Sequence, residues 1–213
     1  MTVTRQFDLP PFDRIEVSMA VEVQVGSGIA QAVQAEASDD EAMERLKLEV
    51  FGRTLHVSRH LGLLALPFLG RGRIVVSVTA PVIERVSASG GSDVHFVGHP
   101  SPSLELEVSA GSRLMAEGVD VERLTAAASS GSRLAIRGQA MVGELRSSSG
   151  ASLEADELEV LHLVVDSASG SRISAVARDA ARIDASSGSS IRLGGHPPKL
   201  DQHASSGASI RLG

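Results

Sequence analysis

Three side chains that can exchange protons occupy equivalent positions of successive sequence repeats: Asp166, Asp184 and His203. Asp201 lies two residues before His203 and would face the same side of a strand. Stacked strands lie about 4.8 Å apart. Neighbouring acids at that spacing could raise one carboxyl pKa, share acid and base roles, or hold a cation. The corresponding chemistry would be cleavage of an acidic polysaccharide.

A second interpretation is a solvated row of charges in which Arg146 and Arg182 supply the counter-charges. We favour it because aromatic residues make up only 2% of the chain, with no Trp and no Tyr, so an aromatic platform for a sugar is missing. Basic subsites for an anionic sugar are missing too. We therefore expect no catalytic residue. The alternative is a carbohydrate-active hydrolase or lyase that uses Asp166, Asp184, Asp201 and His203.

The sequence lacks the residues and spacings that other common catalytic, metal and cofactor sites require. The chain has no cysteine, which excludes disulfides, thiolate metal sites and cysteine nucleophiles. Gly-x-Ser strings are abundant, but they lack the strand–turn–helix context of a nucleophile elbow. The calcium-binding nonapeptide of β-rolls and a phosphate loop are also missing. We expect neither a metal nor another cofactor, because zinc-binding spacing is missing among His56, His60, His95, His99, His162, His196 and His203.

The elements that must position these groups follow from a glycine that returns every 18 to 20 residues. Relative to each glycine, positions +3 and +5 are mostly aliphatic, whereas +2 and −4 carry the charges. A period of about 20 residues with alternation inside it is the signature of a β-solenoid. We predict an all-β fold, a right-handed parallel β-solenoid of about seven short coils, with the hand taken from the general preference of parallel crossovers. The glycines are Gly91, Gly111, Gly131, Gly150, Gly170, Gly188 and Gly207.

Small residues flank each of these glycines at positions −1 and +1, as in Ser130-Gly131-Ser132. They indicate a tight corner in which glycine relieves the backbone constraint. We expect both flanking positions to share the inward parity of +3 and +5. Inward Ser hydroxyls would then bond the amides of the turn or the serine of the next coil.

The first 80 residues are expected to form an antiparallel strand layer that is continuous with the solenoid of residues 81–213. Apolar residues alternate over residues 12–25, and residues 47–50 and 54–58 are typical of a hairpin around Gly52. A short helix is predicted over residues 39–46, with Ser38 or Asp39 as its N-cap. A strand over residues 73–79 ends at Pro81, and the sequence has no flexible linker there.

Two apolar stretches are candidate contact regions. The loop over residues 60–72 lacks periodicity. It is either a plug over an open end or edge of the sheet, or a surface patch that docks a second copy, another protein or a lipid. The final coil would expose unpaired backbone groups, and such an edge invites pairing with another chain. The candidate interface residues are Leu61, Leu63, Leu64, Leu66, Phe68, Leu69, Ile210 and Leu212.

Charge and hydropathy limit the partners. The net charge is −6, the pI is about 5.6, and Lys and Arg form no run, so nucleic acid is not an expected partner. No apolar run is long enough to span a membrane. Residues 1–8 contain no apolar signal-peptide core, so we expect either a cytoplasmic protein or one whose leader has been removed.

Four segments carry a resemblance to a known family: the strand Phe12–Val17, the hairpin Leu46–Val57, and the run Ile74–Pro81 that continues into Val86–Val94. Together they resemble the putative auto-transporter adhesin, head GIN domain family over nearly the whole chain. The resemblance implies a β-helical body with glycine–serine corners and an extracytoplasmic, surface or envelope role in bacteria. We therefore expect a non-enzymatic adhesin-like or envelope scaffold module. Its candidate partners are a second copy and a protein or glycan surface ligand.

Overall fold

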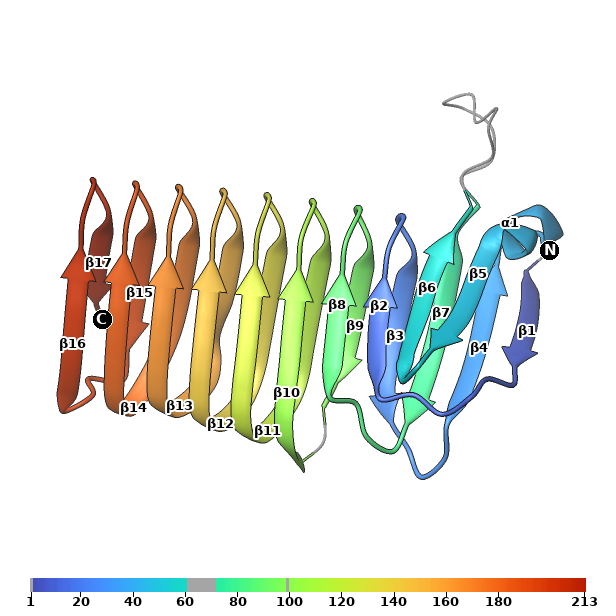
Figure 1. The fold of residues 1–213 in the computed structure, drawn as a ribbon, viewed down its shortest axis with the longest axis horizontal. Coiled ribbons are helices and arrows are strands. Elements are labelled where there is room, and N and C mark those ends of the chain that lie inside the picture. Colours follow the sequence, from blue (N-terminus) through green and yellow to red (C-terminus); the bar gives the residue numbers. More distant parts are fainter. Residues whose placement is uncertain (1, 61–71, 99) are drawn as a thin grey trace.

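The computed structural model describes residues 2–60, 72–98 and 100–213. The chain is nearly all β and forms an elongated stack of strands in two facing layers (Figure 1). Each repeat contributes one strand to each layer, and a tight corner joins them. Because β11 to β14 run through both layers, all the strands belong to one hydrogen-bonded sheet. The apolar candidates from Leu61 to Leu69 lie outside the described residues.

Layer 1 contains the strands that lead into the corners. Along the stack its order is β5 (Leu46–Phe51), β6 (Thr54–Arg59), β2 (Arg14–Val17), β8 (Arg85–Ala88) and β10 (Pro100–Val108), then the second halves of β11 (Arg113–Ala128), β12 (Arg133–Ser147), β13 (Ser152–Ser167) and β14 (Arg172–Ala185), and finally β16 (Lys199–Ala204).

Layer 2 contains the strands that leave the corners. Its order is β1 (Val3–Phe7), β4 (Ala32–Ala37), β7 (Ile74–Ala80), β3 (Glu22–Ser27) and β9 (Asp93–Val97), then the first halves of β11 to β14, and finally β15 (Ser190–Gly194) and β17 (Ser209–Leu212).

The inward columns predicted from the repeat are confirmed. The +3 residues of successive repeats are paired in register, for example Leu114 with Leu134 and Leu134 with Leu153. Both layers point their aliphatic side chains into the space between them, where residues such as Leu145 are fully buried. The parallel β-solenoid is therefore confirmed. Its seven glycine corners are separated by about six turns, slightly fewer than the expected number of coils.

The corners differ from the expectation at position −1. Six of them have a non-glycine residue there with a φ of +50° to +54°, for example Ser149 at +52°, followed by a glycine with positive φ. These −1 side chains lie exposed at the tip of the turn, because a tight two-residue turn needs positive φ at both central residues. Only the +1 side chains point inward. Buried Ser112 accepts hydrogen bonds at Oγ from the amides of Gly91 and Ser92, each at 3.1 Å.

A hydrogen-bond ladder joins the corners along the stack. The amide of Gly150 donates to the carbonyl of Ser169 at 3.0 Å, and that of Gly170 donates to the carbonyl of Ser187 at 3.0 Å. The same bond recurs from Gly91 through to Gly188. An L-residue in the left-handed region costs roughly 1–2 kcal/mol, and the ladder offsets part of that cost at each corner.

The N-terminal end of the stack uses a different strand pairing. Strand β4 is antiparallel to both β1 and β7, and β5 is antiparallel to β6, as the sequence led us to expect. Strands β2 and β3 differ, because they pair in parallel with β6 and β8 and with β7 and β9. Residues 14–27 therefore form a coil of the parallel stack.

Helix α1 (Asp40–Arg45) crosses from β4 in layer 2 to β5 in layer 1 and closes the interior at this end (Figure 1). Asp39 is its N-cap, as one of the two predicted candidates, and its carboxylate accepts from the amide of Ala42 at 2.8 Å. Ala42 and Met43 are buried against the core. No helix in the described part of the chain is long and apolar enough to cross a bilayer.

Candidate binding groove and terminal coil

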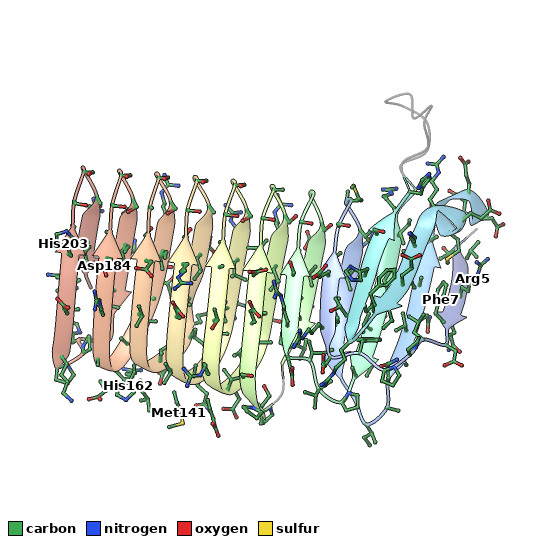
Figure 2. The ribbon with its side chains drawn as sticks, viewed as in Figure 1. Arg5, Phe7, Met141, His162, Asp184 and His203 are labelled. Atoms are coloured by element: carbon green, nitrogen blue, oxygen red, sulfur yellow. The ribbon has the colours of Figure 1, made fainter. Side chains whose placement is uncertain are left out.

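The structure brings three of the sequence-predicted acidic-face residues together. Asp166 on β13 pairs in register with Asp184 on β14, which pairs with His203 on β16. Arg146 on β12 precedes them in the same row. Figure 2 shows Asp184 and His203 on neighbouring strands near the corners, at the C-terminal end of the stack. Asp201 lies on the same face of β16 but pairs in register with Arg182.

Arginines accompany the two stacked aspartates. Arg146 Nε lies 3.5 Å from Asp166 Oδ2, and Arg182 Nε lies 3.4 Å from Asp184 Oδ2. Both pairs are well exposed, so solvent screens them and each adds little to stability. This arrangement matches the solvated row of charges with Arg146 and Arg182 as counter-charges. Within the residues described, no group of three or more His, Asp or Glu side chains is placed to hold a metal ion.

A shallow groove of about 560 Å³ runs beside this row, between the charges and the corners. It crosses layer 1 from β11 to β16, which at about 4.8 Å per strand is about 20 Å. The hollow exists because outward positions close to the corner carry only small side chains. Its floor and walls are Ala127, Ala128, Ser129, Arg146, Ser147, Ser148, Asp166, Ser167, Ala168, Asp184, Ala185, Ser186, His203 and Ser205.

Sequence reasoning missed this groove. The −2 column, with Ser129, Ser148, Ala168, Ser186 and Ser205, was an available signal. Their side chains point outward from the solenoid, so a column of small side chains at this position leaves a hollow on the outer face. Asp201 is not part of the groove. It lines a neighbouring hollow further from the corners, together with Arg182.

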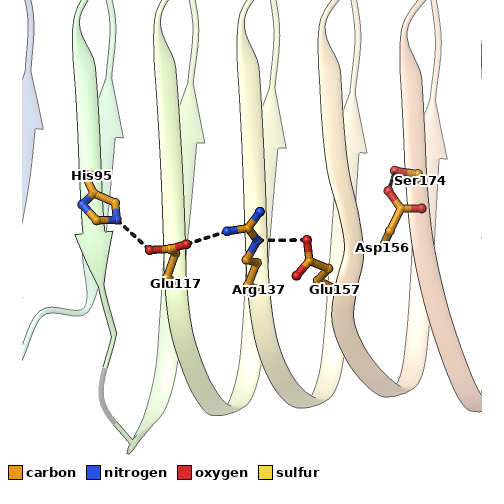
Figure 3. Close-up of polar contacts among 6 residues, drawn as sticks. All are labelled: His95, Glu117, Arg137, Asp156, Glu157 and Ser174. Atoms are coloured by element: carbon orange, nitrogen blue, oxygen red, sulfur yellow. Dashed lines mark hydrogen bonds and ion pairs between the residues drawn. The ribbon is translucent and has the colours of Figure 1, made fainter.

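The outer face of layer 2 carries a connected chain of charges. His95 Nε2 lies 2.9 Å from Glu117 Oε2, Arg137 Nη1 donates to Glu117 Oε1 at 2.6 Å, and Arg137 Nε donates to Glu157 Oε1 at 3.1 Å (Figure 3). The hydrogen bonds from His95 and Arg137 lower the pKa of Glu117. The hydrogen bond to Glu117 and the charge of Glu157 raise the pKa of Arg137.

This chain links four consecutive coils, since its members come from β9, β11, β12 and β13. His95 therefore has a carboxylate neighbour in the next coil. His99, another of the histidines without zinc-binding spacing, lies outside the described residues. Further along the same face, Ser174 donates a hydrogen bond to Asp156 (Figure 3).

The terminal coil holds the two described residues of the candidate interface. Ile210 is partly buried and packs against the core, whereas Leu212 is 54% exposed. Leu212 borders a small, mainly apolar hollow of about 170 Å³, which also contains Leu193 and Leu200. Gln202 pairs in register with Ile183. It is exposed and interrupts the aliphatic column of the preceding coils.

One family model matches most of the chain. The model described as "Putative auto-transporter adhesin, head GIN domain" matches residues 11–197. The chain belongs to this family. The match covers most of the solenoid and the antiparallel end, and it confirms the resemblance seen in the sequence. No curated protein sequence matches the chain.

Solved structures share the head GIN fold at low sequence identity. A putative adhesin from Bacteroides fragilis NCTC 9343 aligns with a TM-score of 0.89 and 16% identity, covering 100% of this chain and 97% of that one. A putative lipid binding protein from Parabacteroides distasonis ATCC 8503 aligns with a TM-score of 0.78 and 14% identity, covering 100% and 96%. These similarities establish a shared fold.

Proposed function

We propose that this head GIN protein is a non-enzymatic, adhesin-like binding module whose ligand lies in the groove of layer 1. Family membership supports a binding role of this kind. The observation that carries the finer proposal is the groove itself, an open hollow of about 560 Å³ with small residues and mixed charges along it. An open groove across several strands suits part of a long molecule better than a small enclosed ligand.

A hydroxyl-rich glycan fits the lining best. Ser129, Ser148, Ser186 and Ser205 each offer a hydroxyl that can both donate and accept hydrogen bonds. Arg146 and the two aspartates add charged partners of both signs. The lining contains no Phe, Tyr or Trp side chain on which a sugar ring could stack. Binding by one groove should therefore be weak, and useful affinity would come from many copies acting together.

The alternative function is a polysaccharide hydrolase or lyase that uses Asp166, Asp184, Asp201 and His203. The stacking of Asp166, Asp184 and His203 is the observation in its favour. The arginines beside Asp166 and Asp184 oppose it, since each carboxylate is already held in an ion pair with a neighbouring side chain of the same outer face. The displacement of Asp201 into a separate hollow also breaks up the proposed set.

The groove can be tested by filling it. Ala168 points outward into the groove from the middle of the stack, so Ala168→Tyr should occupy the hollow. We expect its binding to immobilised neutral and acidic polysaccharides to weaken about tenfold or more. Ala135→Tyr is the matched control, because Ala135 is a half-exposed alanine on the opposite layer.

Three outcomes would contradict the proposal. If Ala168→Tyr and Ala135→Tyr bind polysaccharide equally well, the ligand does not bind in the groove. If the protein binds only to other proteins, the ligand is a protein and not a glycan. Turnover of an acidic polysaccharide that is lost in Asp184→Asn would establish the enzyme. For a binding module, Asp184→Asn should weaken binding only modestly, because the amide keeps a hydrogen-bonding oxygen, and wild type and variant should both leave the polysaccharide intact.

Self-association is a second part of the proposal. Exposed Leu212 and partly buried Ile210 support the terminal coil as the contact for another copy of this chain. Joining copies would also present more than one groove to a surface, which is how weak sites reach useful avidity.

A further inference from the structure

The terminal coil presents two strands with one free edge each among the described residues. Strand β16 pairs only with β14, and β17 pairs only with β15. The amide of Ser205 donates to Ala185 and that of Ser209 donates to Ser189. Because backbone groups alternate along a strand, the free edges belong to residues 200, 202 and 204 on β16 and to residues 210 and 212 on β17.

The N-terminal end of the stack is a poor docking partner for the free edges of β16 and β17. Helix α1 closes the interior there, and its exposed side chains include Asp40, Glu41 and Glu44. A head-to-tail contact would set the terminal coil against the end that carries this charged helix. A symmetric contact between two terminal coils buries the same apolar surface of both copies instead.

A two-fold axis between two terminal coils pairs the edge strands antiparallel. With the axis parallel to the strands, β16 of one copy lies beside β17 of the other. The corner lies at Ser206 and Gly207, so residues 202 and 211 of one copy lie at about the same height. Two registers match the free edges and lie equally close to this height. One sets Gln202 opposite Leu212 of the second copy and His203 opposite Arg211. The other sets Gln202 opposite Ile210 and Leu200 opposite Leu212, and we take it because it joins two apolar side chains.

Between those two pairs, the same register sets Asp201 directly opposite Arg211 of the second copy. Both residues are exposed, and neither has an ion-pair partner in the described part of its own chain. Their backbone groups point into their own chain, so they form the type of antiparallel pair whose side chains lie closest. Within one chain, Arg211 stacks in register on Arg192, a like charge. A carboxylate from a second copy would relieve that repulsion.

The other two-fold geometry is less favourable. An axis perpendicular to the layers pairs β16 with β16 and β17 with β17. If Gln202 lies opposite Gln202 of the second copy, Arg211 lies opposite Arg211 of the second copy. Like charges directly opposite one another destabilise a strand pair.

We propose that two copies of this chain dock through their terminal coils about a two-fold axis parallel to the strands, with Asp201 of each copy paired to Arg211 of the other. The proposal deepens the self-association part of the proposed function and does not depend on the glycan groove. Both layers continue across the axis, and Leu200 and Leu212 of each copy become covered.

Charge reversal tests the pairing. Arg211→Glu sets Glu opposite Asp201 of the second copy, but it also gives Arg192 an opposite charge within the chain. We expect the variant to stay folded and its dimer dissociation constant to rise about tenfold or more. The double variant with Asp201→Arg and Arg211→Glu restores opposite charges and should recover the dimer. Arg172→Glu, on β14 away from the end, is the matched control and should leave the dimer intact.

The measurement is molar mass by light scattering from about 1 to about 100 μM protein, with circular dichroism to verify folding. A monomeric wild type across that range overturns the proposal, as does an unaffected dimer in Arg211→Glu or a double variant that stays monomeric. Gln202→Pro gives a second test. It removes an amide that faces the free edge without breaking the bonds to β14, so it should weaken the dimer, whereas Gln202→Ala should not. The groove variant Ala168→Tyr should leave the mass unchanged, so failure of the groove and failure of the dimer are distinguishable.

Discussion

The two ends of the stack differ in how their last strands and the interior between the layers are covered. At the N-terminal end, antiparallel strands replace the parallel pairing and α1 covers the interior, so Met43 is only 2% exposed. At the other end, β16 and β17 keep the parallel pairing on one side within the described residues, and Leu212 is 54% exposed. Each coil creates the surface on which another coil can pair, so a parallel stack does not end itself. It needs either a change of pairing or a partner.

The largest loss of stability should come from a cavity in the core at the closed end. We expect Met43→Ala to lower the free energy of unfolding by about 2–5 kcal/mol, since a buried methionine leaves a cavity. Leu212→Ala should cost less than about 1 kcal/mol in the monomer, because half of the side chain is already in water. Urea denaturation at low protein concentration compares the two.

Leu145→Ala in the middle of the stack is the reference for a fully buried side chain. Equal losses for Met43→Ala and Leu212→Ala would contradict the difference between the ends. A loss in Leu212→Ala that appears only at high protein concentration would instead agree with the proposed dimer.

A smaller difference in stability is expected between a corner in the middle of the stack and the corner of the terminal coil. Gly150 and Gly207 have similar positive φ values, +71° and +76°, and a Cβ at either would meet no atom within 4 Å. Gly150→Ala should cost about 1–2 kcal/mol from the left-handed backbone alone. Gly207→Ala should cost less, because the terminal coil can open before the rest of the stack unfolds. Hydrogen exchange of the neighbouring corner amides measures both, and equal costs would show that the terminal coil is as firmly held as the middle.

The smallest effect is a pH dependence of the chain of charges on the outer face of layer 2. The pKa of Glu117 is lowered in the folded state, so its stabilising contribution is present above its ordinary value of 4.5 and is lost as the pH falls through the lower folded value. Glu117→Gln should therefore lower the urea midpoint at pH 7, and the difference from wild type should vanish at strongly acidic pH. Glu122→Gln removes an exposed carboxylate from the same strand that has no hydrogen bond or ion pair within the described residues, so this control should leave the urea midpoint almost unchanged. A constant difference at all pH values for Glu117→Gln would exclude the pKa shift as its cause.

Much of the middle of the molecule could be predicted from the sequence, because each coil repeats the one before it. The period of the glycines gives the stacking, and the alternation around Leu134 or Leu153 gives the inward face. The pairing of β2 and β3 could not be predicted in this way. Alternation looks the same in parallel and antiparallel strands, and Ile15 pairs with Val86, far along the chain.

The surface was less predictable than the core. Exposed Ser149 with positive φ has no signature of its own, since serine is not a typical left-handed residue. The contact between His95 and Glu117 is diagonal, because His95 pairs in register with Met115, so the equivalent positions of the repeat do not indicate it. Asp166, Asp184 and His203 could be placed in one row because their strands keep an unbroken register near the corners.

The early position of the closed end in the chain has a consequence for biosynthesis. Strands β2 and β3 find their parallel partners in β6 to β9, so the closed end can assemble once the ribosome has released residues up to Val97. Each later coil pairs with the coil made just before it, about 20 residues back. The nascent chain can therefore add one coil at a time to a template that is already folded, so its order of folding follows its order of synthesis.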